Sequence, residues 1–596
     1  MSQDIFRDEE ILTNAQARGP ISTLFACLRL SGPGWLQAAI TLGGGSLGGA
    51  LYLGMMSGTS MLWLQLVAML IGLVMLMAIA YITVTSGVRP YAAINEHLNP
   101  VLGAGWLLAT ILANMIFILG QFSLCYTAFT DSIYPDFANQ LSEGTDPKLV
   151  VTLVVAAVAM LLTLLSFKPG GMFRIVDFLI KLIVGLVVLC FVGVVVALAM
   201  GNELNWTEIL QGLIPNFQQW NNPSSELQTM LGTMDGSVRD FHEDQLVLNQ
   251  RKVIIGVTAT AVGLNMTFLL PYSLIHRGWT TPAFRGITRM ELIMATAIPF
   301  VLVTSCIVIA SAHAFHAKAD DNFLSSDPAV IQQSPLFGGA TSVLETRYRA
   351  VNEDNEEALA NIPTASDDAS KDAKEKAAAD KKLLLAEFAA GLSADERKLA
   401  LSLVRPNAGQ LATSLEPVLQ PLLAKYPNAP DAKMVFGIGA LAMGFSTIYI
   451  LMLINGYAFA ELFGNFESIP FRFIGSVLAL AMGISWIWIW GTQSATWLLV
   501  ITATFAGILL PIAYIAFFLL MNNRNLLGDF KLTGARMSIW NLLMLLAVAG
   551  AIAQSYGGIT NLVSDQKYSD AAPYIIGGLG TFLVLALIGF SARLRR

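Results

Sequence analysis

The stretch that decides the fold is TLGGGSLGG, residues 41–49. It places five glycines and two hydroxyl side chains inside an apolar segment long enough to cross a bilayer. Each glycine weakens a helix by about 1 kcal/mol relative to alanine, and backbone groups left unpaired in hydrocarbon are costly. We therefore expect a helix break here, with a ligand bound to the exposed backbone groups. The alternative is that the glycines let neighbouring helices pack closely.

A second apolar segment is interrupted in the same way. The sequence VIIGVTATAVGLNMTFLLPYSLIHRGW, residues 253–279, carries Gly263, Asn265, Thr267 and Pro271 in its middle. Two interrupted helices about five spans apart indicate a transporter built from inverted repeats, with its substrate held where the two breaks meet near the bilayer midplane.

The composition is that of a membrane protein with many spans. Of the 596 residues, 55% are hydrophobic and only 13% are charged, and the mean hydropathy is +0.62. About twelve apolar runs reach the roughly 20 residues that a membrane-crossing helix needs. We predict an all-α polytopic membrane protein embedded in a lipid bilayer. The sequence offers no nucleophile–base pair and no phosphate loop, so we expect no enzymatic activity, no cofactor and no nucleic-acid partner.

The predicted organisation alternates membrane spans with polar segments. It comprises a cytoplasmic N-terminus (1–32), spans 1–5 (33–200), an outside loop (201–250), spans 6–7 (251–315), an insert (316–433), spans 8–10 (434–521), and spans 11–12 with a cytoplasmic C-terminus (522–596). Basic residues in alternate short loops predict both termini on the cytoplasmic side of the cell's inner (plasma) membrane. The insert is rich in Ala, Glu, Lys and Leu, and it is predicted to be a mainly helical extracytoplasmic cap, structural or binding a protein partner.

Three segments resemble the Nramp transporter family. They are GPGWLQAAITLGGGSLGGALYLG (32–54), VFGIGALAMGFSTIYILMLINGYAFAELF (435–463) and LLVITATFAGILLPIAYIAFFLLMNNRNLLGDF (498–530). The resemblance implies two inverted five-helix repeats, as in sodium-coupled amino-acid symporters, followed by two further C-terminal helices.

The chain departs from that family at the positions that bind metal. The first-span Asp-Pro-Gly-Asn motif reads Gly-Gly-Gly-Ser at 43–46, and the sixth-span Met-Pro-His reads Thr-Phe-Leu at 267–269. Acidic residues of the third span fall on Phe117 and Gly120, and the eighth-span Gln falls on Phe445. A dehydrated divalent cation needs hard oxygen ligands or soft donors. We therefore expect no transition-metal site.

A site made of backbone N–H groups, hydroxyls and helix dipoles suits a small oxyanion or a neutral polar solute. Bicarbonate is the preferred substrate because it is small, planar and monovalent, while nitrate, formate and a small amide stay open. The predicted substrate-binding residues are Thr41, Gly43, Gly44, Gly45, Ser46, Asn265, Thr267, Phe268, Tyr272 and Ser273.

A coupling sodium ion is expected beside this site. The resemblance to the symporter fold implies that adjacent hydroxyls in the eighth span, Ser446 and Thr447, face the first break and bind sodium together with Gly43. The alternative is that these hydroxyls bond back to their own helix. Residues predicted to line the path, or else to bond between helices, are Asn114, Phe117, Gln121, Thr304 and Phe445.

The sequence therefore predicts a secondary active transporter of bicarbonate, driven by sodium through alternating access. One alternative is an Nramp-related transporter of magnesium or another partly hydrated divalent cation, in which water supplies most ligands. An alternative of a different class is a non-transporting membrane sensor or scaffold whose insert binds a partner.

Overall fold

The computed structural model describes residues 2–30, 32–142, 144–167, 171–364, 370–423, 431–490, 495–564 and 572–594. Within these ranges every regular element is a helix. Nine helices in this part of the chain are long and apolar enough to cross a membrane, and the number is eleven if each of two bent pairs is one span. A shorter apolar helical stretch lies at Pro573–Gly589. Together they correspond to the twelve predicted apolar runs.

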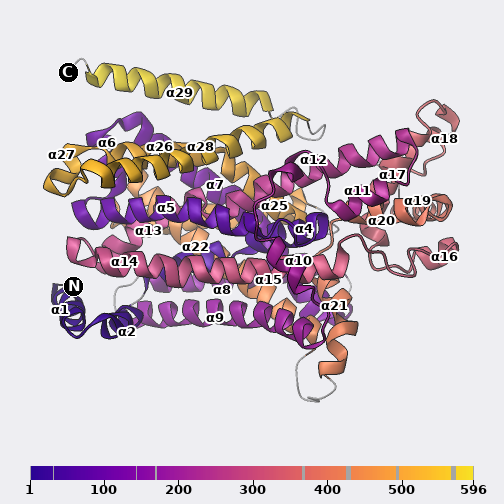
Figure 1. The fold of residues 1–596 in the computed structure, drawn as a ribbon, viewed down its shortest axis with the longest axis horizontal. Coiled ribbons are helices and arrows are strands. Elements are labelled where there is room, and N and C mark those ends of the chain that lie inside the picture. Colours follow the sequence, from indigo (N-terminus) through magenta and orange to yellow (C-terminus); the bar gives the residue numbers. More distant parts are fainter. Residues whose placement is uncertain are drawn as a thin grey trace.

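The first five spans do not form a separate side of the bundle but lie among the later spans (Figure 1). The spanning helices are α3 (Pro33–Thr41) with α4 (Gly44–Ser57), α5 (Trp63–Ser86), α7 (Pro100–Thr127) continued by η1 (Ala128–Ile133), α8 (Pro147–Ser166) and α9 (Gly171–Met200). Shorter elements are α1 (Ser2–Ala17), α2 (Pro20–Leu30), α6 (Pro90–His97), η2 (Pro135–Gln140), α10 (Trp206–Gln211), η3 (Phe217–Trp220) and α11 (Ser225–Leu231).

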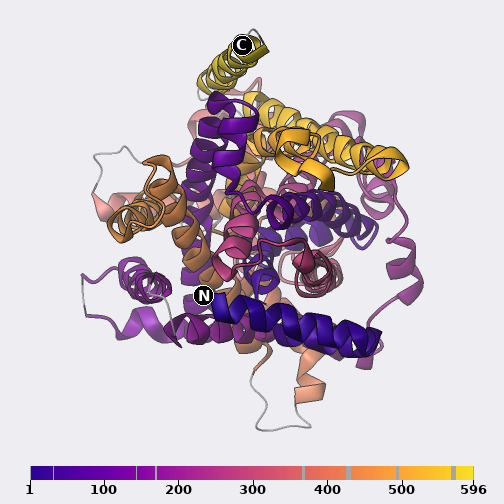
Figure 2. The same ribbon diagram turned by 90° about the vertical axis from the view of Figure 1, so that its left-hand side faces the viewer.

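The remaining spans complete the bundle. The sixth span is α12 (Gly236–Ala261) with α13 (Leu264–Arg277), and the seventh is α15 (Ile298–Phe315), preceded by η4 (Pro282–Phe284), α14 (Arg285–Glu291) and η5 (Leu292–Ala297). The eighth to tenth spans are α22 (Ala432–Leu462), α23 (Ile469–Ile484) with α24 (Trp486–Ile489), and α25 (Ala495–Ile508) with α26 (Leu510–Met521). The last two are α28 (Gly534–Ser564) and α29 (Ala572–Leu594). Two short helices, α27 (Arg524–Leu527) and η6 (Gly528–Phe530), precede α28. In Figures 1 and 2, α29 lies at the rim of the bundle.

The insert forms a helical cap at one end of the bundle. Its helices are α16 (Pro328–Ile331), α17 (Phe337–Val351), α18 (Glu356–Ala360), α19 (Lys371–Gly391), α20 (Ala394–Ser402) and α21 (Ala408–Leu423). The segment predicted as an outside loop also contributes, because α12 begins at Gly236 and runs without interruption into the sixth span. The cap therefore includes an uninterrupted extension of a broken helix.

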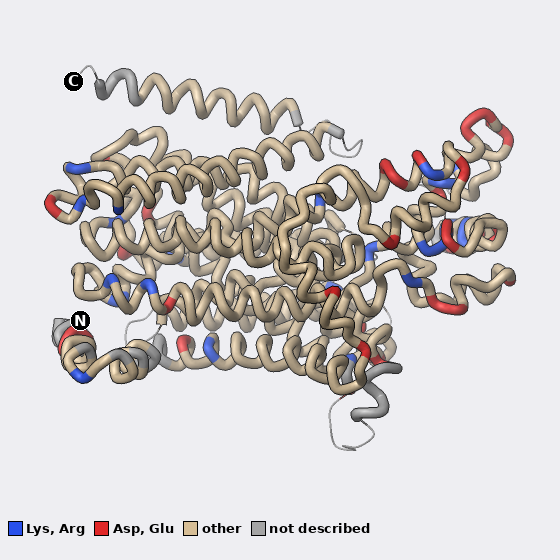
Figure 3. The backbone as a smooth tube through the Cα atoms, viewed as in Figure 1, with Lys and Arg blue, Asp and Glu red and all other residues tan. Residues whose placement is uncertain are grey.

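Charged residues gather at the two ends of the long axis of the molecule. Figure 3 shows Lys, Arg, Asp and Glu gathered in the cap and at the opposite end of the bundle, with an almost uncharged middle. An uncharged band of this kind is expected of a segment that crosses a bilayer, because an unpaired charge at the bilayer centre is costly. Inside the band, α4 packs against α7, α12, α15 and α25, while α3 packs against α13, α22 and η5. The first span is thus surrounded by other helices.

Candidate substrate-binding site

The first span breaks at the glycine run. Helix α3 ends at Thr41 and α4 begins at Gly44, with a bend of 46° between them. The Leu42 N–H still donates to Ala38 O at 2.8 Å, and the Ser46 hydroxyl donates to Thr41 O. The break predicted from the sequence is therefore present, and a short polar side chain bonds one of its carbonyls.

The sixth span breaks at Val262 and Gly263. Helix α12 ends at Ala261 and α13 begins at Leu264. The Met266 N–H donates to Asn265 Oδ1 at 2.8 Å, while Tyr514 Oη donates to Val262 O at 3.4 Å. Side chains thus satisfy backbone groups on both sides of this break, as buried peptide groups require.

The starts of α4 and α13 border the same small cavity. It has a volume of about 20 Å³, which is room for about one water molecule. Its lining comes from the two breaks and from α7, α12 and α25: Ile40, Ser46, Ala113, Phe117, Ala259, Thr260, Gly263, Leu264, Asn265, Met266, Ala503 and Ala506. None of these described lining residues is charged, so the field inside comes from backbone dipoles, hydroxyls and one amide.

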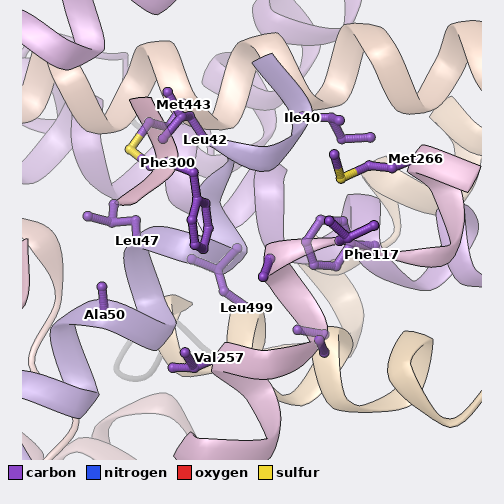
Figure 4. Packing of buried hydrophobic residues seen from close by; sticks show 14 of the residues in the cluster. Ile40, Leu42, Leu47, Ala50, Phe117, Val257, Met266, Phe300, Met443 and Leu499 are labelled. Atoms are coloured by element: carbon purple, nitrogen blue, oxygen red, sulfur yellow. The ribbon is translucent and has the colours of Figure 1, made fainter. Parts of the chain in front are cut away.

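The glycines allow side chains from other spans to reach the first break. The Gly44 N–H donates to Gln121 Oε1 at 2.9 Å. A Cβ added at Gly45 would lie 2.6 Å from Phe117 Cζ, and one at Gly43 would collide with Thr447 Oγ1. Figure 4 shows Phe117 and Met266 close together beside Ile40. Close packing, the alternative explanation for the glycines, is therefore also present, and it occurs at the break itself.

The two hydroxyls of the eighth span lie against the first break. Ser446 Oγ donates to Ala39 O at 3.1 Å and also approaches Met443 O at 3.2 Å, while Thr447 Oγ1 donates to Met443 O at 2.8 Å. Both side chains are at most 1% exposed. Each hydroxyl therefore bonds its own helix, as the alternative expected, and Ser446 also reaches the carbonyl end of α3. Sodium binding at these hydroxyls stays a prediction.

Several predicted site residues on α13 lie away from the cavity lining. Because α13 begins at Leu264, Thr267 and Phe268 fall within its first turns. Thr267 Oγ1 donates to Leu264 O at 2.6 Å and accepts from Trp106 Nε1 at 3.2 Å. Phe268 stacks on Tyr272 with ring centroids 4.1 Å apart. Ser273 Oγ donates to Leu270 O at 2.7 Å. These residues support α13, whereas Leu264, Asn265 and Met266 border the cavity.

The predicted path residues divide in the same way. Phe117 lines the cavity and Gln121 holds the start of α4. Asn114 Nδ2 instead donates to Asn455 Oδ1 at 3.0 Å, which ties α7 to α22. Thr304 Oγ1 donates to Phe300 O in its own helix at 2.7 Å. Phe445 is partly buried and does not line the cavity.

Sequence reasoning missed Met266 and Thr260. The Thr41 hydroxyl donates to Met266 Sδ at 3.0 Å, so a thioether joins the two breaks. The position of Met266 directly after Asn265 could have indicated a site residue. A methionine in an apolar segment is, however, usually interpreted as a core-packing residue. Across the described ranges, no group of three or more His, Cys, Asp and Glu residues could hold a metal ion. The absence of a transition-metal site stays a prediction.

Comparison with known proteins places this architecture in a family. The sequence model of the family described as "Natural resistance-associated macrophage protein-like", or Nramp, matches residues 34–345 and 399–557. The chain belongs to the Nramp family. Between the two matched segments lie residues 346–398, which hold much of the cap. A search of curated proteins found no match.

Solved structures similar to this Nramp chain include those of a manganese transporter from Eremococcus coleocola. Two mutants of that transporter and its complex with an aromatic bis-isothiourea compound each give a TM-score of 0.57. Identity is 13–14%, and the match covers 96% of both chains. At this identity the likeness establishes the fold. The predicted all-α membrane architecture with the Nramp fold is therefore confirmed.

Proposed function

We propose that this Nramp protein is a secondary active transporter of a small monovalent anion, with bicarbonate as the first substrate to test and sodium as the coupling ion. The observation that carries the proposal is the pair of amide oxygens at the two helix starts. Gln121 Oε1 accepts from the Gly44 N–H, and Asn265 Oδ1 accepts from the Met266 N–H. Each oxygen occupies a place that an anion's oxygen would take.

The electrostatics of the cavity favour this substrate class. Both α4 and α13 point the positive end of their dipoles at the cavity, and helix starts are established anion-binding elements. The described lining residues include no carboxylate that would repel an anion. Ser46, Thr260 and Asn265 supply hydroxyl and amide groups that donate and accept, which suits a protonated oxyanion. Rotation of Gln121 would free the Gly44 N–H. The Met266 N–H also donates to Gly263 O at 3.1 Å, so an anion's oxygen would share that donor with the carbonyl.

Sodium is supported by neutral oxygens at the other side of the break. The Ser446 hydroxyl lies 3.1 Å from Ala39 O and 3.2 Å from Met443 O. The Thr447 hydroxyl lies 2.8 Å from the same Met443 carbonyl. Carbonyl ends of broken helices coordinate coupling cations in inverted-repeat transporters. Each hydroxyl can turn its hydrogen away and present a lone pair. Anion and cation would then bind on opposite sides of the break in the first span.

A divalent cation is the second candidate, and two observations favour it. The Met266 sulfur lies at the junction of the two breaks, and a thioether is a soft donor that transition metals accept. The Eremococcus coleocola proteins with the same fold are described as manganese transporters. Hydrated magnesium is less suited to this conformation, because the cavity holds about one water.

Orientation is part of the proposal. We place the cap outside the cell's plasma membrane and both termini in the cytoplasm, following the basic residues of the short loops. Arg89, Arg277 and Arg285 belong to these loops. Arg89 lies just after α5, Arg277 is the last residue of α13 and Arg285 is the first residue of α14, at the ends of the spans opposite to the cap-side extension of α12.

The test is a paired flux assay on purified protein in liposomes. Uptake of labelled bicarbonate is measured with and without an inward sodium gradient, beside manganese and magnesium uptake. The proposal predicts bicarbonate accumulation that requires sodium. Metal uptake without bicarbonate uptake would instead establish the cation function. Absence of all fluxes in protein that is folded and inserted would favour the non-transporting sensor.

A further inference from the structure

The cap contains a second cavity that the proposed transport function does not use. Its volume is about 360 Å³, within the range of small-molecule sites. One wall is the face of α12 that carries Phe241, Gln245 and Asn249, spaced four residues apart. The opposite wall is the face of α17 that carries Gly338, Ser342 and Thr346, spaced in the same way. The cavity is thus a cleft between two helices.

The spacing of the two helices is fixed by a buried charge cluster. Arg347 on α17 donates through Nε to Glu396 Oε1 at 2.9 Å, and His242 on α12 lies 3.3 Å from the same oxygen. Glu396 comes from α20, and all three side chains are at most 10% exposed. Phe241, which lines the cleft, also lies beneath the Arg347 guanidinium. The cleft is therefore bounded by a pinned helix pair.

The chemistry of the lining selects an anion with hydroxyl groups. Arg405 is the one charged side chain among the described residues that line the cleft. Its planar guanidinium matches a carboxylate with two parallel hydrogen bonds. Gln245 and Asn249 offer amides that both donate and accept, and the α17 wall adds hydroxyls. A cation would find no carboxylate among these residues.

We propose that this cleft, defined as the cavity between α12 and α17 closed by Arg405, binds a small hydroxylated organic anion. The carboxylate lies against Arg405, and the hydroxyls lie along Gln245 and Asn249. This site is separate from the one between the broken helices and holds whether or not the chain transports bicarbonate.

Occupancy of the cleft would reach the membrane helices through Arg405. The Arg405 guanidinium lies 4.2 Å from the centre of the Trp497 ring on α25, and that ring meets the edge of Tyr52 on α4 at 5.1 Å. Tyr52 Oη also donates to Pro406 O at 3.1 Å. The residue that contacts the anion is therefore packed on the cap-side halves of the first and tenth spans, and Trp497 fluorescence should change when the anion binds.

The experiment is titration calorimetry on the full-length protein in lipid nanodiscs, with sodium gluconate as the probe. Sorbitol, which has a similar size and hydroxyl pattern but no charge, is the matched control ligand. We expect saturable heat with gluconate and none with sorbitol. Failure of gluconate to bind, or equal binding of sorbitol, overturns the proposal.

Two variants locate the binding. A Cβ at Gly338 meets no atom within 4 Å, so Gly338→Trp fills the cleft without a clash at its base and should weaken gluconate binding at least about tenfold. Arg405→Gln should weaken it comparably. Gly391→Trp is the matched control, since Gly391 ends α19 in the same cap and also has nothing within 4 Å. Wild-type affinity in both cleft variants would overturn the proposal, and Arg405→Gln alone decides if Gly338→Trp does not fold.

Discussion

Gln121 on α7 holds the first backbone donor of α4, because the Gly44 N–H donates to Gln121 Oε1 at 2.9 Å across the break of the first span. The contact joins two helices that are 77 residues apart in the sequence, and both partners are fully buried. The proposed anion would replace this contact. Changing the side chain at position 121 therefore distinguishes transport of an anion from transport of a cation.

Gln121→Glu is the variant that separates them most clearly. It places a carboxylate where the anion's oxygen should sit, and like charges in contact cost several kcal/mol. We expect bicarbonate uptake to fall at least about tenfold. Uptake is measured in liposomes at matched protein insertion. Increased manganese uptake with unchanged bicarbonate uptake would contradict the anion account.

Met266→Leu tests the role of the thioether. This exchange conserves volume, so its packing cost should stay below about 1.5 kcal/mol. If the substrate is an anion, loss of the sulfur that accepts from Thr41 removes no ligand, and bicarbonate uptake should stay within about threefold of wild type. A selective loss of metal uptake in this variant would instead identify Met266 as a metal ligand.

Gly43→Ala tests the close approach of Thr447 to the first break. An added Cβ collides with Thr447 Oγ1 and lies 2.9 Å from Ile40 O. Overpacking of this kind costs about 1–3 kcal/mol. We expect a lower midpoint of thermal unfolding, partly restored in the double variant Gly43→Ala with Thr447→Ala. The control is Gly185→Ala on α9, where nothing lies within 4 Å and stability should not fall.

The cap should loosen in acid through Glu396. Burial raises the pKa of Glu396, but hydrogen bonds from His242 and Arg347 outweigh it, so the pKa lies below its usual 4.5. A carboxyl whose folded pKa is depressed contributes stability above its unfolded pKa and loses it as pH falls through the folded value. Calorimetric unfolding of the cap should therefore be constant above about pH 5 and decline in stronger acid.

Glu396→Gln is the control for that titration. It should remove the acid dependence and lower cap stability by about 3–5 kcal/mol, because Arg347 then stays buried without its partner. A cap whose stability already falls between about pH 7 and 6 would contradict the assignment to Glu396.

The sequence could predict where both spans break but not what meets at the breaks. Glycines at 43–45 and Gly263 mark the breaks because their helix propensity is low. The contacts of Gln121 with Gly44 and of Met266 with Thr41 join residues far apart in the chain. Tyr272 and Ser273 were expected at the site but do not line its cavity. Their direction depends on where α13 restarts, at Leu264, and this restart follows from packing rather than from composition.

The cap shows the same limit more strongly. Its helices follow from Ala-, Glu- and Lys-rich sequence and from capping residues such as Ser393, whose hydroxyl accepts from the Glu396 N–H at 3.1 Å. His242 stands in a run of charged residues, RDFHED at 239–244. In the structure His242 is fully buried against Glu396, 154 residues away. Pairing at this separation cannot be read from local patterns.

The most direct test of the central claim is the initial rate of bicarbonate uptake, with and without an inward sodium gradient, in wild type and in Ser446→Ala. Removing the Ser446 hydroxyl takes away the contact with Ala39 O, so sodium stimulation should be weakened. The control is Thr163→Ala, which removes a buried hydroxyl that donates to Ala159 O in its own helix and should behave as wild type. Sodium-independent uptake that Ser446→Ala leaves unchanged, or manganese uptake without bicarbonate uptake, would contradict the account.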